Sequence, residues 1–161
     1  MKNLKKLLCI LLAVCLLTAM VGCAKKDDAK TEEKPGDTMS LDDILTRIED
    51  GVDLPTVMHT ALDEDSFEYI AFAAWQDGVE AMVSEPPMSS VAHSVVIVRA
   101  KDEAQAQTLA KEMEQNMNPR KWVCVEAEKS EVIVHNRTIL LVMSFEDTEQ
   151  ALKDNFDALW K

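Results

Sequence analysis

Three histidines, His59, His93 and His135, could bind a metal, because imidazole together with carboxylates can hold zinc or copper. Each lies in a different segment. The sequence contains no His-x-x-x-His or Cys-x-x-Cys pair that would place two ligands on one face. A histidine in a strand beside serine, as His93 is beside Ser94, is more often a hydrogen-bonded core or edge residue. The sequence therefore predicts neither a metal site nor another cofactor.

Cys124 and His93 form a second candidate pair, since a thiol becomes a nucleophile when a nearby base favours the thiolate. The run from Trp122 to Val125 argues against this chemistry. It has the pattern of a strand interior, where cysteine behaves as a small apolar residue. We therefore predict an inert Cys124. An envelope hydrolase or thiol enzyme that uses His93 and Cys124 is the alternative.

Arg120, Lys121 and Trp122 are a candidate binding site, with His93 as a fourth member. Two cations and an indole interrupt an acidic chain just after a predicted helix ends. Arg and Trp are enriched at binding hot spots, so the block could bind an anionic or aromatic partner. The competing interpretation is structural, because cations complement a helix C-terminus and Trp122 could fill the core. The sequence leaves both open.

The N-terminal segment indicates where these side chains work. Lysines precede a charge-free run of 15 residues, Leu7–Val21, and the run ends in Met20-Val21-Gly22-Cys23. These features are typical of a secretory signal, and the run is shorter than the roughly 20 residues that span a membrane. The final tetrapeptide resembles a bacterial lipobox. We therefore predict a signal peptide at 1–22, a covalent lipid on Cys23 and an extracytoplasmic location on the cell membrane.

Charge and cysteine content narrow the possible partners. The formal net charge of the whole chain is −12, and losing the three signal lysines leaves −15. An acidic surface is repelled by phosphate backbones, so nucleic acid is excluded as an expected partner. Cys9 and Cys15 leave with the signal and the lipid consumes the Cys23 thiol, so only Cys124 keeps a thiol and no disulfide is expected. The expected partners are the membrane, through the lipid, and an extracellular ligand or protein.

The mature chain divides into a tether and one domain. Residues 23–39 comprise the lipidated cysteine and a charged stretch with a Pro-Gly break, which we expect to be disordered. Residues 40–161 form the folded part. Its predicted helices begin after Ser40, Asp102 and near Asp147, each a capping residue ahead of an apolar stripe. The last helix is expected over 147–160, with a capping box from Asp147 and Gln150.

Six runs have the composition of strands, and short gaps favour antiparallel pairing. The predicted strands cover 66–72, 79–83, 91–99, 121–127, 131–135 and 138–144, with Gly78 separating the first two. Residues 52–65 are expected to be mostly loop. The Val-Val-Ile-Val centre of 91–99 predicts burial on both faces. We therefore expect a single α+β domain with an antiparallel or mixed sheet of about four to six strands and helices mainly on one face.

Four segments together resemble the DUF4358 domain family, clostridial-type bacterial lipoproteins of unknown function. They are SEPPM at 84–88, AHSVVIVR at 92–99, NPRKWVCVEAEK at 118–129 and TILLVMS at 138–144. The resemblance covers roughly residues 40–160. A departure is the turn at Asn136-Arg137, where relatives are expected to have Gly. The resemblance implies a surface lipoprotein and no catalytic residue. The function expected from the sequence is a membrane-anchored, non-enzymatic domain that binds a ligand or partner.

Overall fold

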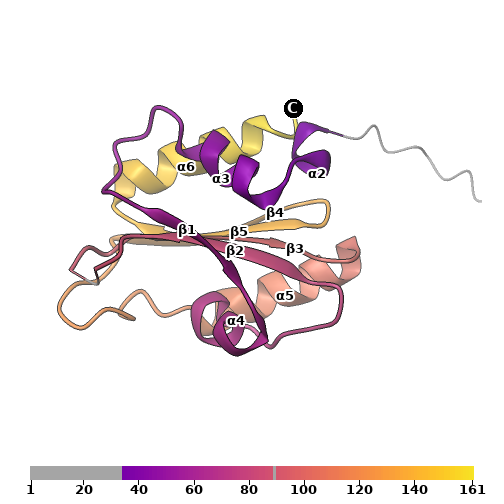
Figure 1. Ribbon diagram of the computed structural model, residues 1–161, viewed down its shortest axis with the longest axis horizontal. Helices are drawn as coiled ribbons and strands as arrows, with labels where there is room; N and C mark the ends of the chain where they lie inside the picture. Colours follow the sequence, from indigo (N-terminus) through magenta and orange to yellow (C-terminus); the bar gives the residue numbers. More distant parts are fainter. Residues whose placement is uncertain (1–33, 89) are drawn as a thin grey trace, which may run out of the picture. The chain divides into compact units, whose positions relative to one another are not determined.

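The computed structural model describes residues 34–88 and 90–161. The expected signal peptide, Cys23 and the expected tether up to residue 33 lie outside the described residues. In the described part, a five-stranded sheet has the order β1-β2-β3-β5-β4, with every neighbouring pair antiparallel (Figure 1). The strands are β1 Met58–Leu62, β2 Glu80–Glu85, β3 Ser94–Arg99, β4 Lys129–His135 and β5 Thr138–Ser144. The α+β prediction is confirmed.

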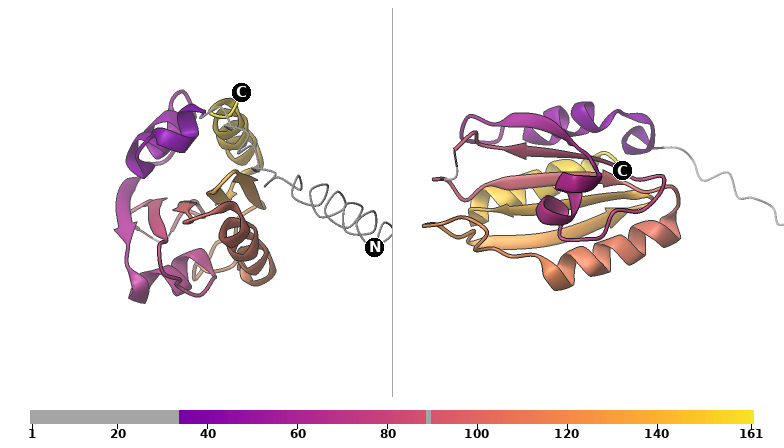
Figure 2. Two further views of the ribbon diagram at one scale, coloured as in Figure 1. Left: turned by 90° about the vertical axis from the view of Figure 1, so that its right-hand side faces the viewer. Right: turned by 60° about the horizontal axis from the view of Figure 1, so that its bottom comes forward.

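Helices cover both faces of this sheet, which corrects the expectation that they lie mainly on one (Figures 1 and 2). One face carries α2 Pro35–Thr38, α3 Leu41–Glu49 and α6 Glu146–Ala158, and the other carries α4 Glu64–Ala71 and α5 Glu103–Asn116. The reason lies in β3, whose six residues are all buried. Alternate residues of a strand point to opposite faces, so an apolar run of this kind needs a covering layer on each side.

Two apolar cores follow from this alternation. Val96 and Val98 of β3 belong to the core under α4 and α5. Val95 and Ile97 belong to the core under α3 and α6. Full burial of each such side chain contributes about 1.5–3 kcal/mol, so the central strands stabilise the domain from both sides.

The two predicted helices with the clearest caps are present. Ser40 precedes α3 and its hydroxyl accepts a hydrogen bond from the Asp43 amide at 3.1 Å. Asp102 caps α5 in the same way, through the Gln105 amide at 2.8 Å. The last helix begins differently from the prediction, because its N-cap is Phe145, with no side-chain cap and no box from Asp147.

Two predictions before β2 are wrong. Residues 66–72 are mostly helix α4 and not a strand, because Asp63 and Ser66 form a capping box that starts a helix in front of the aromatic residues. The segment 52–65, expected as loop, contains β1. This edge strand exposes most of its residues, so it lacks the apolar alternation from which strands are recognised.

The expected strand at 121–127 is also absent. These residues form an irregular loop between α5 and β4. The hairpin between β4 and β5 is confirmed, with a two-residue turn at Asn136-Arg137. Asn136 has a φ of 51° and Arg137 does not adopt positive φ. Asparagine tolerates this left-handed region better than most residues, so the turn forms without glycine.

The folded domain begins before Ser40, which corrects the extent of the expected disordered tether. Residues 35–38 form α2, and Gly36 is buried against Trp160 so closely that a Cβ would collide with the indole. The Arg99 guanidinium donates hydrogen bonds to the carbonyls of Met39 at 2.8 Å and Gly36 at 3.0 Å. Between residue 34 and the C-terminus, no helix has the length and apolar character needed to cross a membrane.

Candidate functional site

The loop between α5 and β4, here called the 119–128 loop, contains three of the four predicted binding residues. Lys121 turns inward and its side chain is only 9% exposed. Its ammonium pairs with the Glu85 carboxylate and donates to the Ser94 hydroxyl at 2.9 Å. Glu85 ends β2 and Ser94 begins β3, so Lys121 fastens this loop to one end of the sheet.

Two aromatic rings enclose the same ammonium. The centroid of Trp122 lies 5.3 Å from Lys121 Nζ and that of Phe72 lies 5.9 Å away. Trp122 is buried in the core under α5. Phe72 has a φ of 60°, a strained value for a bulky residue, as the left-handed cap of α4. Cation–π attraction adds to the ion pair, so the base of the loop is rigidly held.

The outer part of this loop faces solvent. Val123 is 90% exposed, Cys124 is an exposed free thiol, and Arg120 forms an ion pair with Glu126 at the surface. An open cleft of about 460 Å³ runs along the loop. It is lined by Arg120, Trp122, Val123, Cys124, Val125 and Glu126. Because Cys124 is exposed in a loop, the strand-interior argument for its inertness no longer applies.

His93 lies apart from this surface. It is fully buried, and its Nδ1 lies 2.9 Å from the Ser144 hydroxyl. Burial lowers the pKa of His93, and the Lys121 charge acts in the same direction against Glu49 and Glu85. Within the described chain no hydrogen bond joins His93 to Cys124, and His93 does not line the Cys124 cleft. The four predicted residues therefore do not form one exposed surface.

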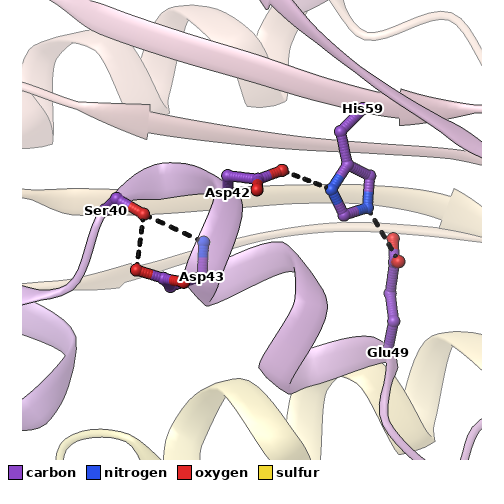
Figure 3. Close-up of polar contacts among 5 residues, drawn as sticks. All are labelled: Ser40, Asp42, Asp43, Glu49 and His59. Carbon is purple, nitrogen blue, oxygen red and sulfur yellow. Dashed lines mark hydrogen bonds and ion pairs between the residues drawn. The ribbon is translucent and has the colours of Figure 1, made fainter.

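A second polar site, which the sequence reasoning did not find, centres on His59 of β1 (Figure 3). Its Nδ1 lies 2.7 Å from Asp42 Oδ1 and its Nε2 lies 2.9 Å from Glu49 Oε2. Asp42 and Glu49 are seven residues apart on α3, which is two helical turns, so both carboxylates face β1. That spacing was the available signal, but the partner histidine lies in a segment expected to be loop.

The two neighbouring carboxylates favour the charged form of the His59 imidazole. Burial alone would lower the pKa of His59, but hydrogen bonds and charge interactions with Glu49 and Asp42 raise it above its ordinary value. A protonated ring donates from both nitrogens, which matches a carboxylate on each side. The contact pins the edge strand β1 onto α3.

Unpaired polar atoms lie beside His59 and its two carboxylate partners, here called the His59 clamp. His59 and Ser84 are directly opposite in the β1–β2 register, so their side chains share a face. Among the described residues, Glu49 Oε1, Ser84 Oγ and His93 Nε2 are buried without a hydrogen-bond partner. The described chain contains no group of three His, Cys, Asp or Glu side chains placed to hold a metal ion.

Comparisons with family models, with curated proteins and with solved structures find no match for this chain. The class that the structure defines is a single α+β domain with a five-stranded antiparallel sheet. The resemblance to the DUF4358 family stays a prediction from the sequence, and so do the lipidation of Cys23 and the location at the membrane.

Proposed function

We propose that this protein is a lipid-anchored binding domain on the extracytoplasmic face of the cell membrane, and that it acts without enzymatic chemistry. Its contact surface is the end of the sheet formed by the 119–128 loop and the β2–β3 connection. The partner is a protein at the cell surface. The sequence up to Cys23 supports the location, and the geometry of Lys121 supports the contact surface.

The position of Lys121 is the observation that carries the proposal. It joins Glu85 and Ser94, the two ends of the β2–β3 connection, to the 119–128 loop. The connection exposes Met88 at 69% and the loop exposes Val123 at 90%. Exposed apolar side chains on neighbouring loops are typical of protein contacts. Because the base of these loops is already held in place, the loops lose little conformational entropy when a partner binds.

The rival function, a thiol enzyme or hydrolase that uses His93 and Cys124, gains no support from the geometry. The His93 ring is buried and paired with Ser144. Cys124 lies on the solvent side of its loop. A general base must be within hydrogen-bond reach of the proton it takes, and this arrangement does not provide that.

Photo-crosslinking in cells tests the contact surface. A photoreactive residue at Val123 should give one discrete, heavier adduct with a partner protein. The matched control places the same residue at Thr46, which is exposed on α3 on the other face of the sheet. Equal adducts at both positions, or none at Val123, would contradict the proposed surface.

Labelling with a fatty acid tests the anchor separately. Cys23→Ser removes the thiol on which the thioether forms, so the label should disappear and the protein should leave the membrane fraction. Label retained on this variant would contradict lipidation at Cys23. The two experiments fail independently, because one concerns the anchor and the other concerns the sheet end.

A further inference from the structure

A fully buried histidine lies at the end of the sheet to which the 119–128 loop is fastened. His93 directly precedes Ser94, the first residue of β3, whose hydroxyl accepts the hydrogen bond from Lys121 Nζ. Lys121, Ser94 and Glu85, the residues that hold the loop, are here called the Lys121 latch. The charges of Lys121 and Glu85 both act on the His93 imidazole. A titratable ring is therefore built into the structure that holds this loop.

The surroundings of the His93 ring disfavour a positive charge on it. Its Nδ1 lies 2.9 Å from the Ser144 hydroxyl, but its Nε2 is buried and has no hydrogen-bond partner in the described chain. A protonated imidazole carries an N–H on both nitrogens. Protonation would therefore bury an N–H donor without an acceptor, together with a full charge, and both are costly. Burial accordingly lowers the pKa of His93.

The neighbouring acids already have cationic partners. Among the described residues, the charged groups that act on His93 are Glu49 on α3, Glu85 on β2 and Lys121 on the loop. Glu49 contacts His59 of β1 at 2.9 Å, and Glu85 pairs with Lys121. A charged His93 would therefore share Glu85 with the Lys121 ammonium, and the two cations would repel each other.

Lys121 can leave this group at a lower cost than His93. The imidazole directly precedes β3, a strand whose residues are all buried. Lys121 belongs to an irregular loop, and its side chain is 9% exposed. A long lysine side chain reaches water by rotation about its own bonds, and its ammonium then regains its hydration. Its departure also removes a positive charge that acts on His93.

We propose that the Lys121 latch is acid-sensitive: protonation of His93 releases Lys121, and with it the 119–128 loop, from the end of the sheet. The loop belongs to the proposed contact surface, so a weaker hold on the partner in mild acid rests on the proposed function. The release itself is a property of the folded domain. It can be measured without a partner, so a failed crosslink at Val123 and a failed release are separate results.

The direction of the pH effect follows from linkage. The pKa of His93 is lowered in the latched state, so the released state binds more protons in mild acid. The released state therefore gains population as pH falls below about 6.5, the ordinary pKa of histidine. Above that pH the imidazole is neutral in both states and the latch is at its strongest.

Hydrogen exchange of backbone amides, measured by mass spectrometry on the mature protein, tests the release. The protection of peptides that cover residues 119–128, corrected for the intrinsic pH dependence of exchange, should fall roughly five- to 30-fold between pH 7.5 and pH 5. A released imidazole with an ordinary pKa of about 6.5 sets the upper limit. Peptides of α5 should keep their protection. Unchanged protection of the loop, or an equal loss in α5, would overturn the proposal, because the latter indicates unfolding of the whole domain.

Two histidine variants locate the sensor. His93→Gln should abolish the pH dependence of loop protection, because it removes the titrating ring. His135→Gln is the matched control, since it removes an imidazole from the last residue of β4, at the other end of the sheet. It should leave the pH dependence of the loop unchanged. The same loss of protection in His93→Gln as in the wild type would overturn the role of His93.

An NMR titration of the wild-type imidazoles keeps the test independent of how well His93→Gln folds. Variants at His59 and His135 assign the three resonances. The His93 resonance should titrate below about pH 6.5, and the loss of loop protection should follow the same transition. A His93 ring that titrates at or above this value, or a loop that opens in a different pH range, would overturn the proposal.

Discussion

The indole of Trp160 donates a hydrogen bond to Asp37 Oδ1 at 3.0 Å, and this contact joins the first described helix to the last residues of the chain. The same indole stacks on His135, with ring centroids 5.0 Å apart and an angle of 15° between the planes. Asn136 donates to Asp37 at 2.9 Å from the neighbouring hairpin turn. The segment before Ser40 is therefore an integral part of the domain.

Gly36→Ala should lower the free energy of unfolding, because its Cβ would collide with the Trp160 ring. Overpacking of this kind costs about 1–3 kcal/mol. Helix propensity alone predicts the opposite sign, a gain of up to about 1 kcal/mol. Denaturant titration distinguishes the two. Thr38→Ala, at an exposed position of the same helix, serves as the control, and a stabilised Gly36→Ala variant would show that α2 is not docked.

Substitutions of Lys121 and Arg120 should change the free energy of unfolding by very different amounts, although the two residues are adjacent cations. Lys121→Met leaves Glu85 without its partner beside the core, which should cost about 2–4 kcal/mol of unfolding free energy. Arg120→Ala removes only a surface ion pair and should cost at most about 1 kcal/mol. Thermal and denaturant melting measure both. Similar losses would mean that Lys121 does not hold the loop.

The clamp at His59 predicts a pH dependence of stability. The folded pKa of His59 is raised above its unfolded value, so its stabilising contribution is complete below about pH 6.5 and is lost as pH rises through the folded pKa. The stability difference between the wild type and His59→Gln should therefore be larger at pH 6 than at pH 9. Asp42→Asn should reduce this difference. A difference that grows with pH would refute the charged clamp.

Cys124 should react quickly with a thiol reagent in the native protein, because it is exposed in a loop. We expect the native and denatured rates to agree within a few-fold. The mature protein suits this measurement because Cys124 is its only expected free thiol. The Cys124→Ser variant gives the background rate of labelling. Slow native labelling that becomes fast in denaturant would restore the interpretation of Cys124 as a buried strand residue.

The sequence predicted those elements whose signals are local. The caps at Ser40 and Asp102 and the apolar run of β3 each lie within one segment, and each gave the right element. The error at 66–72 came from the aromatic and β-branched content of this segment, and the Asp63–Ser66 capping box ahead of it was not recognised. The error at 121–127 came from interpreting the run Trp122–Val125 as the interior of a strand. The segment is instead a loop held by Lys121, whose partners lie 36 and 27 residues away.

The contacts around His59 and around Glu149 could not be predicted from local sequence patterns. His59 is separated from Asp42 by 17 residues and from Glu49 by 10, and only the packing of β1 on α3 brings them together. Glu131 and Glu149 lie on β4 and α6, and the burial of Glu149 depends on how that helix rests on the sheet. Contacts of this kind depend on tertiary packing, which periodicity and capping rules do not encode.

The packing of α2 against the rest of the domain also determines how the domain would bear a mechanical load. The Gly36 amide donates to the Leu159 carbonyl at 3.1 Å, and Arg99, at the end of the central strand, holds the Gly36 carbonyl. A pull on the chain ahead of Pro35 would therefore be shared at once by α6 and the middle of the sheet. Lys121 fastens the 119–128 loop at Ser94, the other end of β3. A load applied ahead of Pro35 would thus reach the 119–128 loop by two routes, through the fully buried strand β3 and through α6, whose Glu146 amide donates to the Glu128 carboxylate at 3.1 Å.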